Sequence, residues 1–315
     1  MKTFPFIFCF LMIALGCSRS ELSPQMLPAN VDSKTVYTTF YPTTAFAEAI
    51  AGDLLEIVCP LPHDADPIFW QPSAKDILDY QNAALIITNG AGFERWLSTA
   101  SLPPSRLIDT AAGFEKAFLH IEGLRSHSHG GQGEHSHEGL DGHTWLDPVL
   151  AGVQARAILE AFVVRWPEQT EIFQTRHEVL ENQFEQLDRA FAALAPRMDS
   201  MQILCSHPAY QYLAKRYGWR ITNFDLDPDT PLSVETLNEL KSAAAPTTST
   251  PNGKCLILWE SQPLLATQKE LTRSGIPSVW FSPVEMRSQD DITKQRDYFE
   301  LMRANLARLE AALDH

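Results

Sequence analysis

Short apolar runs alternate with helical patterns along the first half of the chain. Runs rich in β-branched and other apolar residues predict strands at 35–40, 54–58 and 84–88, with a weaker one at 107–108. Helices are predicted between them, one beginning at Pro42 with Phe46 and Ile50 on one face, and one running from Ser73 to Tyr80. Strands that alternate with helices pair in parallel, so this half predicts a doubly wound α/β sheet.

One long amphipathic segment separates this half from the next. After Trp166-Pro167, side chains recur at spacings of three and four on one helical face: Phe173, His177, Leu180, Phe184, Leu187, Phe191 and Leu194. The predicted helix, from Glu168 to Leu194, is about 40 Å long at roughly 1.5 Å per residue, and Pro196 is expected to end it. A helix of this length between alternating strands suits a rigid strut that joins two lobes.

The alternation of strands and helices resumes after the strut. Strands are predicted at 202–205, 219–223, 255–259 and 278–281, and helices at 210–217, ended by Gly218, and at 233–241, capped by Ser233. The segment 243–253 is rich in Pro, Thr and Ser and predicts a surface loop. A closing amphipathic helix is marked by Ile292, Phe299, Met302, Leu306, Leu309 and Leu313. The predicted fold class is therefore α/β, with two lobes, each a parallel sheet flanked by helices, bridged by one long rigid helix.

The N-terminal residues predict an export signal and a tether rather than part of the fold. Lys2 precedes an apolar run of about 12 residues, which is too short to span a bilayer and typical of a signal peptide. Ala14-Leu15-Gly16-Cys17 resembles a bacterial lipobox, in which the cysteine is acylated; an ordinary cleaved signal peptide is the alternative. We expect an exported protein anchored through Cys17. The predicted organisation is a signal peptide at 1–16, a lipid-anchored tether at 17–33, an N-terminal lobe at 34–150, a helical linker at 151–195 and a C-terminal lobe at 196–315.

Charge and cysteine content narrow the classes of partner and compartment. The formal net charge of −14 at pH 7 argues against nucleic acid, because binding a row of phosphates needs many Lys and Arg side chains. Besides Cys17, the exported chain keeps Cys59, Cys205 and Cys255. Their odd number leaves at least one free thiol in an oxidising compartment. Each lies in or beside an apolar run, which favours buried thiols. A disulfide between Cys205 and Cys255 is the alternative.

Three of the ten histidines stand where predicted strands end or loops begin. His63 and His207 each follow a predicted strand, and His143 lies in Asp141-Gly142-His143-Thr144-Trp145. Ligands of open α/β sheets bind beyond the carboxyl ends of the strands. His63 and His207 belong to different halves, so an ion bound by both would lie in a cleft between two lobes. A lone histidine is more often a surface or hydrogen-bonded residue, and it is the joint pattern that favours a metal site.

Five segments resemble those of the solute-binding proteins of zinc and manganese ABC transporters. The similarity extends from Thr35 to the C-terminus. The segments are Thr39-Phe40-Tyr41-Pro42, Pro62-His63-Asp64-Ala65-Asp66-Pro67, Asn89-Gly90-Ala91-Gly92-Phe93-Glu94-Arg95-Trp96-Leu97, His143-Thr144-Trp145-Leu146-Asp147-Pro148, and His207-Pro208-Ala209-Tyr210 with Tyr217-Gly218 downstream. That family has two α/β lobes bridged by one long helix, which agrees with the predicted strut.

The resemblance implies a set of metal ligands. His63 and His143 would come from the N-terminal lobe and its edge, and His207 from the C-terminal lobe. Members of the family often supply a carboxylate from an Asp-Pro after the last strand, but this chain has Ser282-Pro283 there. We therefore predict three imidazoles and a water, with Glu260 as the alternative fourth ligand or a supporting carboxylate. The residues expected to orient the ligands are Asp66, Trp145 and Asp147.

The predicted ligands favour zinc as the metal. Imidazole suits zinc and copper, whereas manganese and magnesium prefer oxygen ligands, and manganese-type members of the family usually bring two carboxylates. The segment 126–138 is rich in His and Gly and cannot pack a core, so it predicts a loop with weak, exchangeable metal sites; a solvated linker is the alternative. Zinc-type members often carry such a loop before the second ligand. Its histidines are His127, His129, His135 and His137.

These observations predict a protein that captures Zn²⁺ between two lobes and hands it, as a monomer, to an ABC permease and its ATPase. A zinc hydrolase is one alternative, because three imidazoles and a water also form catalytic sites. No HExxH helix or nucleophile elbow is present, so we expect no enzyme activity. A manganese-type, adhesin or storage member of the same family is the other alternative.

Overall fold

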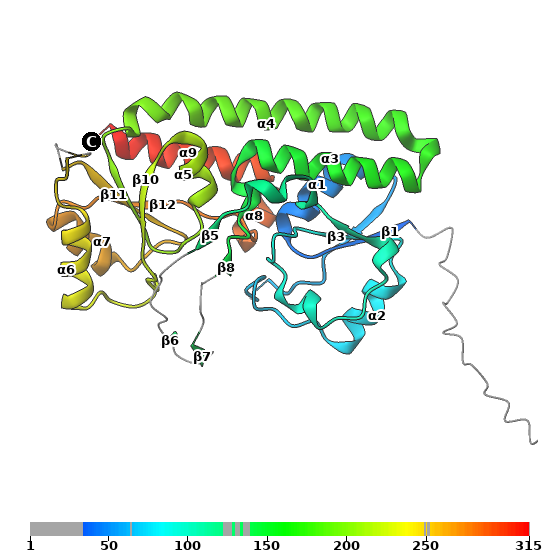
Figure 1. Cartoon of the computed structure of the whole chain (residues 1–315), viewed down its shortest axis with the longest axis horizontal. Coiled ribbons are helices and arrows are strands. Elements are labelled where there is room, and N and C mark those ends of the chain that lie inside the picture. Colours follow the sequence, from blue (N-terminus) through cyan, green and yellow to red (C-terminus); the bar gives the residue numbers. More distant parts are fainter. Residues whose placement is uncertain are drawn as a thin grey trace, which may run out of the picture.

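The chain folds into two lobes that lie end to end along one long helix, α4 (Thr170–Met198) (Figure 1). The computed structural model describes residues 34–63, 65–121, 128–129, 133–134, 139–248, 250 and 253–314. The predicted signal peptide and tether, with Cys17, lie outside these residues, as do His127, His135 and His137.

Each lobe is built on a four-stranded parallel sheet, which confirms the predicted fold class. The strand order is β2-β1-β3-β4 in the N-terminal sheet and β10-β9-β11-β12 in the C-terminal sheet, so the two lobes share one topology. In such sheets a crevice opens at the carboxyl ends of the strands, where the strand order reverses. The strands are β1 (Thr35–Thr38), β2 (Glu56–Val58), β3 (Leu85–Thr88), β4 (Leu107–Asp109), β9 (Gln202–Cys205), β10 (Arg220–Asn223), β11 (Cys255–Trp259) and β12 (Ser278–Trp280).

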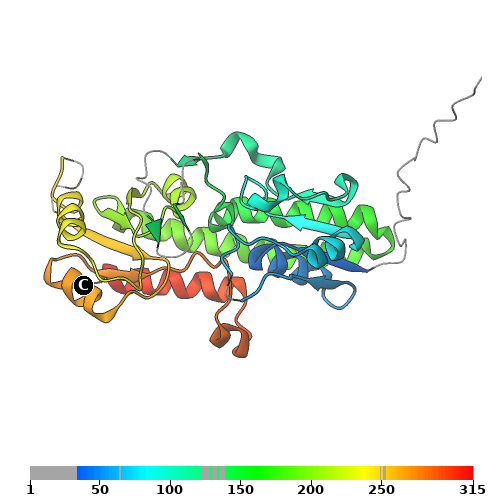
Figure 2. The same ribbon diagram turned by 90° about the horizontal axis from the view of Figure 1, so that it is seen from below.

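Helices cover the sheets and connect the lobes. Figure 2 shows α9 alongside α4 in the C-terminal lobe, and the segment of α8 projecting from the middle of the molecule. Two short antiparallel pairs, β5 (His120–Ile121) with β8 (Gly139–Leu140) and β6 (Ser128–His129) with β7 (Gly133–Glu134), lie between the N-terminal sheet and α3 in the chain. The remaining helices are α1 (Tyr41–Ala51), α2 (Ala74–Asn82), α3 (Pro148–Arg165), α5 (Gln211–Tyr217), α6 (Val234–Ala243), α7 (Leu265–Arg273), α8 (Gln289–Thr293) and α9 (Tyr298–Leu313).

Several helix boundaries follow the predicted capping residues. The Ser73 hydroxyl accepts a hydrogen bond from Asp76 N, and the Asp76 carboxylate accepts one from Ser73 N, which forms a capping box at the start of α2. Ser233 caps α6 by accepting from Thr236 N. Gly218 ends α5 with a φ of 71°, in the left-handed region that favours glycine.

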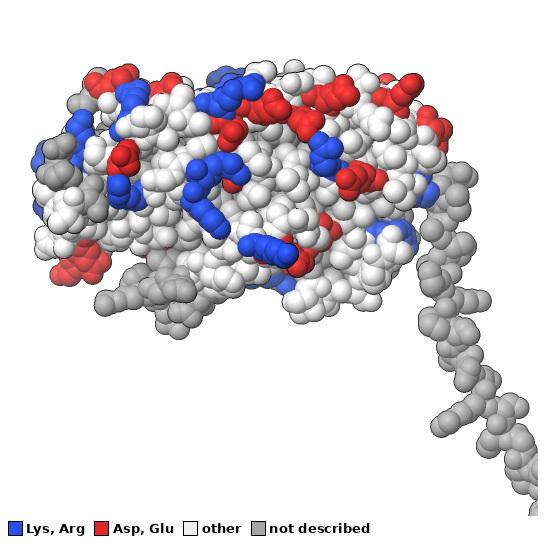
Figure 3. All heavy atoms as spheres, turned by 45° about the horizontal axis from the view of Figure 1, so that its top comes forward, with Lys and Arg blue, Asp and Glu red and all other residues white. Residues whose placement is uncertain are grey.

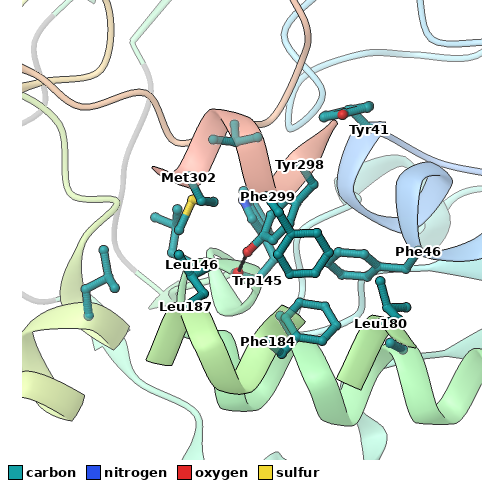
Figure 4. Packing of buried hydrophobic residues seen from close by; sticks show 14 of the residues in the cluster. Tyr41, Phe46, Trp145, Leu146, Leu180, Phe184, Leu187, Tyr298, Phe299 and Met302 are labelled. Carbon is teal, nitrogen blue, oxygen red and sulfur yellow. Dashed lines mark hydrogen bonds between the residues drawn. The ribbon is translucent and has the colours of Figure 1, made fainter. Parts of the chain in front are cut away.

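The apolar face of α4 joins the lobes into one continuous core. All seven side chains predicted to share this face are at most 4% exposed. The ring of Phe184 packs edge-on against Phe46 of α1 and Phe299 of α9, with centroids 5.2 and 4.8 Å apart (Figure 4). A single cluster of buried apolar residues runs through both lobes. The predicted strut therefore exists, and it is packed against its lobes along its length.

Two predicted helix boundaries are wrong. Pro196 does not end α4, which continues to Met198. The Met198 side chain is 1% exposed, so burial of this last turn outweighs the one backbone N–H that proline lacks. Ile292 does not belong to the closing helix but to the separate short helix α8. Asp297 starts α9 by accepting from Glu300 N, which separates the two helices.

The cysteines in the described residues are free thiols. Cys205 and Cys255 lie on the neighbouring strands β9 and β11, but the register pairs Cys205 with Leu258. Three residues of strand, about 10 Å at 3.3 Å per residue, separate Leu258 from Cys255. That offset exceeds the Cα separation that a disulfide can bridge. A Cys205–Cys255 disulfide is therefore excluded.

Charged side chains of both signs are scattered over the surface around α4. On the face that carries α4, Lys and Arg side chains are interspersed with Asp and Glu and form no broad basic stripe (Figure 3). Among the described residues, no helix combines the length and the apolar composition that crossing a bilayer requires.

A buried carboxylate holds the loop that follows β3. Glu94 accepts hydrogen bonds from Thr39 Oγ1 at 2.6 Å, from Asn89 N at 2.6 Å and from Gly90 N at 3.2 Å. Burial raises the pKa of Glu94 to about 6 in spite of these donors. Gly90 has a φ of 80°, and a Cβ there would lie 1.8 Å from an oxygen of Asp109, so only glycine fits.

Glu94→Gln should change how stability depends on pH. The Glu94 pKa is near 4.5 in the unfolded chain and about 6 in the folded one. As pH rises through this window the unfolded state loses its proton first, so the wild type should lose about 2 kcal/mol relative to the glutamine variant. Urea unfolding of both proteins at about pH 4 and pH 7.5 measures this difference. Parallel stability curves would contradict the assignment.

Candidate metal site

Two of the predicted ligands, His143 and His207, meet between the lobes. Their rings lie edge to face with centroids 5.8 Å apart. His207 follows β9 directly, at the carboxyl edge of the C-terminal sheet, and His143 precedes the short 3₁₀ turn Thr144–Leu146 that leads into α3. Both side chains line one cavity of about 360 Å³. Of the two histidines that the strand-end rule placed together, His207 lies at this cavity and His63 does not.

A carboxylate that the sequence analysis missed contacts the ring of His143. Glu285 Oε1 lies 3.0 Å from His143 Nε2. Glu285 stands in the turn that follows β12, so it also lies beyond the carboxyl end of a strand. The family pattern directed attention to Ser282, three residues earlier in the same turn. Considering every residue of that turn would have identified Glu285.

The backbone that carries Glu285 is held in an unusual conformation. Val284, which is fully buried, has a φ of 60°, a region that a β-branched residue rarely enters. Such a conformation persists only where its surroundings hold it. Trp145 Nε1 donates to Pro283 O at 2.7 Å, and Val284 N donates to Ser282 Oγ at 3.1 Å. These bonds keep the turn from relaxing and fix the direction of Glu285.

Further hydrogen bonds attach the same turn to the C-terminal lobe. Asn305 of α9 donates to Ser282 O at 2.7 Å and accepts from Ser282 N at 3.0 Å. The Tyr210 hydroxyl donates to Phe281 O at 2.6 Å. Tyr210 and Trp145 each stand within three residues of one of the two histidines. Buried aromatic side chains therefore cross-link the three turns that meet at the cavity.

Trp145 lies directly beside His143. Its ring is fully buried, with its centroid 5.3 Å from that of the imidazole. Its carbonyl oxygen accepts a hydrogen bond from the Tyr298 hydroxyl of α9 (Figure 4). Trp145 thus binds the C-terminal lobe through both its indole and its backbone, and this position suits the supporting role predicted for it.

The two predicted supporting aspartates have different surroundings. Asp66 accepts from Ile68 N at 2.8 Å, and partial desolvation of its carboxyl by the surrounding protein, together with the negative charge of Glu285, raises the pKa of Asp66. Asp147 accepts from two backbone N–H groups in the first turn of α3 and pairs with the guanidinium of Arg216 on α5. Asp147 therefore caps a helix and links the lobes, whereas Asp66 lies in the electrostatic field of the cavity.

Carboxylates on both sides of His143 favour a positive charge on its ring. Asp141 Oδ1 lies 2.7 Å from His143 Nδ1 and also accepts from His143 N at 2.9 Å. Burial alone would lower the pKa of His143, but Asp141 and Glu285 outweigh burial and raise it to about 10. The position is thus suited to a cation, and a bound metal ion would compete with the proton on this ring.

The pKa of His207 shifts in the opposite direction to that of His143. Burial, and then the neighbouring charge of His143, lower the pKa of His207, which favours the neutral imidazole, the form that binds a metal ion. Glu260 Oε2 lies 3.8 Å from His207 Nδ1, which is too long for a hydrogen bond but close enough for an electrostatic interaction. Burial, and then Glu285, raise the pKa of Glu260 to about 7.

His63 does not join the other two histidines. It lies in an exposed turn after β2 and lines a separate cavity of about 220 Å³ beside Cys59. Asp66, three positions after His63, interacts electrostatically with His207. The chain from His63 to Asp66 spans at most about 11 Å. Within the described ranges, no three His, Cys, Asp or Glu side chains come close enough together to form a complete metal site. The three-histidine ligand set therefore stays a prediction.

Described residues on either side of the histidine-rich segment line the cavity of His143 and His207. Ile121, which ends β5, and Gly139 and Leu140 of β8 line the same cavity as the His143 and His207 rings. Of its four histidines, only the backbone of His129 belongs to the described residues. The weak metal sites predicted for this segment remain a prediction.

Comparisons with known proteins point to one family. The family model described as "Zinc-uptake complex component A periplasmic" matches residues 36–312. The chain is 27% identical over 317 residues to the "High-affinity zinc uptake system protein ZnuA" of Bacillus subtilis (strain 168). The aligned region covers 97% of this chain and 95% of that protein.

Two further comparisons involve AdcA of Streptococcus pneumoniae. The chain is 26% identical over 285 residues to the "Zinc-binding lipoprotein AdcA" of strain ATCC BAA-255 / R6, covering 89% of this chain and 56% of AdcA, so it spans little more than half of that protein. The crystal structure of the Zn(II)-bound ZnuA-like domain of AdcA matches with a TM-score of 0.74 at 24% identity, covering 90% of this chain and 100% of that domain. At this identity the match supports the fold.

Trp145→Phe should lower the free energy of unfolding by about 1–3 kcal/mol, because Pro283 O loses its buried donor. Trp280→Phe is the matched control. Trp280 Nε1 also donates to a backbone oxygen, that of Glu260 at 3.2 Å, but Trp280 is 41% exposed and water can replace the bond. We expect a loss below about 1 kcal/mol there. Urea unfolding measures both, and equal losses would argue against the cross-link.

Proposed function

Since the chain belongs to the family of periplasmic zinc-uptake components A, we propose that it captures Zn²⁺ between its lobes and delivers the ion to an ABC permease and its ATPase. One observation carries this proposal: His143 contacts both His207, with ring centroids 5.8 Å apart, and Glu285, whose Oε1 lies 3.0 Å from His143 Nε2. Imidazole nitrogens and carboxylate oxygens are ligands that zinc accepts in proteins.

We propose four protein ligands, His63, His143, His207 and Glu285. Glu285 takes the place of the water predicted from sequence, and Glu260 orients His207 through the Nδ1 side of its ring. His63 reaches the ion through a shift of the exposed turn that carries it. Four protein ligands complete the tetrahedral shell of zinc and leave no open position for a reacting water. This closed shell favours a binding protein over the hydrolase alternative.

The proposed place of action is outside the cytoplasm, where the chain works as a monomer held to a membrane by a lipid on Cys17. Support comes from the similarity of Ala14-Leu15-Gly16-Cys17 to a lipobox and from the description of AdcA, a relative, as a zinc-binding lipoprotein. A tether of this kind keeps the protein near a permease in the same membrane.

Zinc titration of the metal-free chain, with a chelator present to mask weak sites, should reveal one tight site. Glu285→Gln and His207→Ala should each raise the Kd by at least about 10–100-fold, because each removes a ligand. His177→Gln is the matched control, since His177 is buried on α4 among apolar side chains. Unchanged Kd values for both site variants would refute the site. If only His63→Ala leaves the Kd unchanged, the His63 assignment alone fails.

Cys17→Ala should release the protein from the membrane, since acylation needs the cysteine sulfur. Fractionation of cells that express the full chain should find the wild type in the membrane fraction and the variant among soluble exported proteins. Cys59→Ala controls for the loss of a thiol as such. A variant that stays in the membrane fraction would argue against the lipid anchor.

A further inference from the structure

A buried polar network lies directly behind the turn that carries His143, and the proposed ligands leave it without a function. It consists of the side chains of Asn89, Thr110, Thr144 and Gln154, all 0% exposed. We propose that Asn89 and Gln154 are positioning residues that fix the His143 turn and thereby set the zinc affinity. This inference rests on the proposed function.

The Asn89 side chain binds the backbone on one side of His143 and a side chain on the other. Its Nδ2 donates to Gly142 O at 2.9 Å and to the carbonyl of the following residue at 3.0 Å. Its Oδ1 accepts from Thr144 Oγ1 at 3.2 Å and from Gln154 Nε2 at 2.8 Å. Both N–H groups and the oxygen of the amide are engaged, so its orientation is fixed, although the single Thr144 proton is shared between Asn89 Oδ1 and Gln154 Oε1.

Gln154 anchors this arrangement to regular secondary structure. Its Nε2 donates to Thr110 Oγ1 at 2.9 Å as well as to Asn89, and its Oε1 accepts from Thr144 Oγ1 at 3.2 Å. The Thr110 hydroxyl in turn donates to Thr88 O, at the end of β3, at 2.8 Å. Gln154 belongs to α3, so the His143 turn is held between a helix and the carboxyl edge of the sheet.

Close packing leaves the turn little freedom to adjust by itself. A Cβ added to Gly142 would lie 2.9 Å from the Phe93 side chain and 3.1 Å from its backbone. Phe93 belongs to the same segment as Asn89, and its ring centroid lies 6.2 Å from that of His143. The segment 89–97 therefore fits against the His143 turn through both shape and hydrogen bonds. This contact gives a physical role to a motif that coordinates no metal in the proposed site.

The network and Asp141 fix different parts of the ligand. Asp141 binds the Nδ1 side of the His143 ring, which directs Nε2 toward Glu285. The position of Nε2 also depends on the backbone of the turn, and Asn89 fixes this backbone by donating to Gly142 O. A buried polar network is not required for stability, because apolar side chains of the same shape can be nearly neutral replacements. Its directional bonds instead specify the geometry of the turn.

Asn89→Asp tests the proposal with almost no change in shape. It places an oxygen where Nδ2 now donates, so that two hydrogen bonds to carbonyl oxygens, including Gly142 O, become repulsive contacts. The zinc Kd should rise about 10–100-fold. In the metal-free protein, the Nδ1 proton resonance of His143, assigned by its loss in His143→Ala, should shift.

A double-mutant cycle separates positioning from general damage. In the His143→Ala background, Asn89→Asp should change the zinc Kd by less than about twofold, because the ligand it positions is gone. Equal fold losses in both backgrounds, or an unshifted His143 resonance, would overturn the proposal. Tyr80→Phe is the matched control: it removes a buried hydrogen bond to Thr38 O in the same lobe and should leave the Kd within about twofold.

A second variant covers the case in which Asn89→Asp does not fold. Thr144→Val removes only the hydroxyl that lies 3.2 Å from both Asn89 Oδ1 and Gln154 Oε1, and should raise the Kd about 3–10-fold. An unchanged Kd in Thr144→Val, with affinity still lost in His143→Ala, would refute the positioning role alone. An unchanged Kd in His143→Ala would instead refute the proposed site.

Discussion

The contact between the two lobes along α4 is the constraint on which the geometry of the cleft depends. Phe184 on this helix packs against an aromatic ring from each lobe, and the buried core continues through both lobes. Trp145 extends the same contact to the cleft, where its indole binds the turn that carries Glu285. Lobes joined in this way cannot swing freely about a hinge. Metal exchange should therefore depend on local change, and the exposed turn of His63 is the part of the proposed site free to provide it.

Most of the fold could be predicted because its elements carry local signals. The strands are short apolar runs, the buried face of α4 repeats every three to four residues, and Ser73, Ser233 and Gly218 mark helix ends. The helix α3 was not predicted as a separate element, because it contacts α1, α4 and the sheet edge and shows no simple apolar stripe. Pro196 was wrongly predicted to end α4 for a related reason. Proline usually ends a helix, but burial of the turn that contains Met198 outweighs this effect.

The site could be predicted only in part. The end of β9 indicated the position of His207, whereas His143 was singled out by its resemblance to a family segment and lies in the turn before α3. Glu285 was missed because only the aligned position Ser282 was considered in that turn, and the direction of its side chain depends on the positive φ of Val284, which neighbouring side chains hold. The position of His63 also depends on tertiary packing of an exposed turn. Desolvation, and then the negative charge of Glu285, raises the pKa of Asp66 and of Glu260, and a divalent cation beside them would stabilise their charged forms.

The most direct test of the central claim is a crystal structure of the zinc-loaded chain with anomalous data collected at the zinc edge. The account predicts one strong peak between the lobes, with a nitrogen of His143, a nitrogen of His207 and a carboxylate oxygen of Glu285 each about 2.0–2.2 Å from the ion. A strong peak elsewhere, with these three side chains beyond about 4 Å from any zinc, would contradict it.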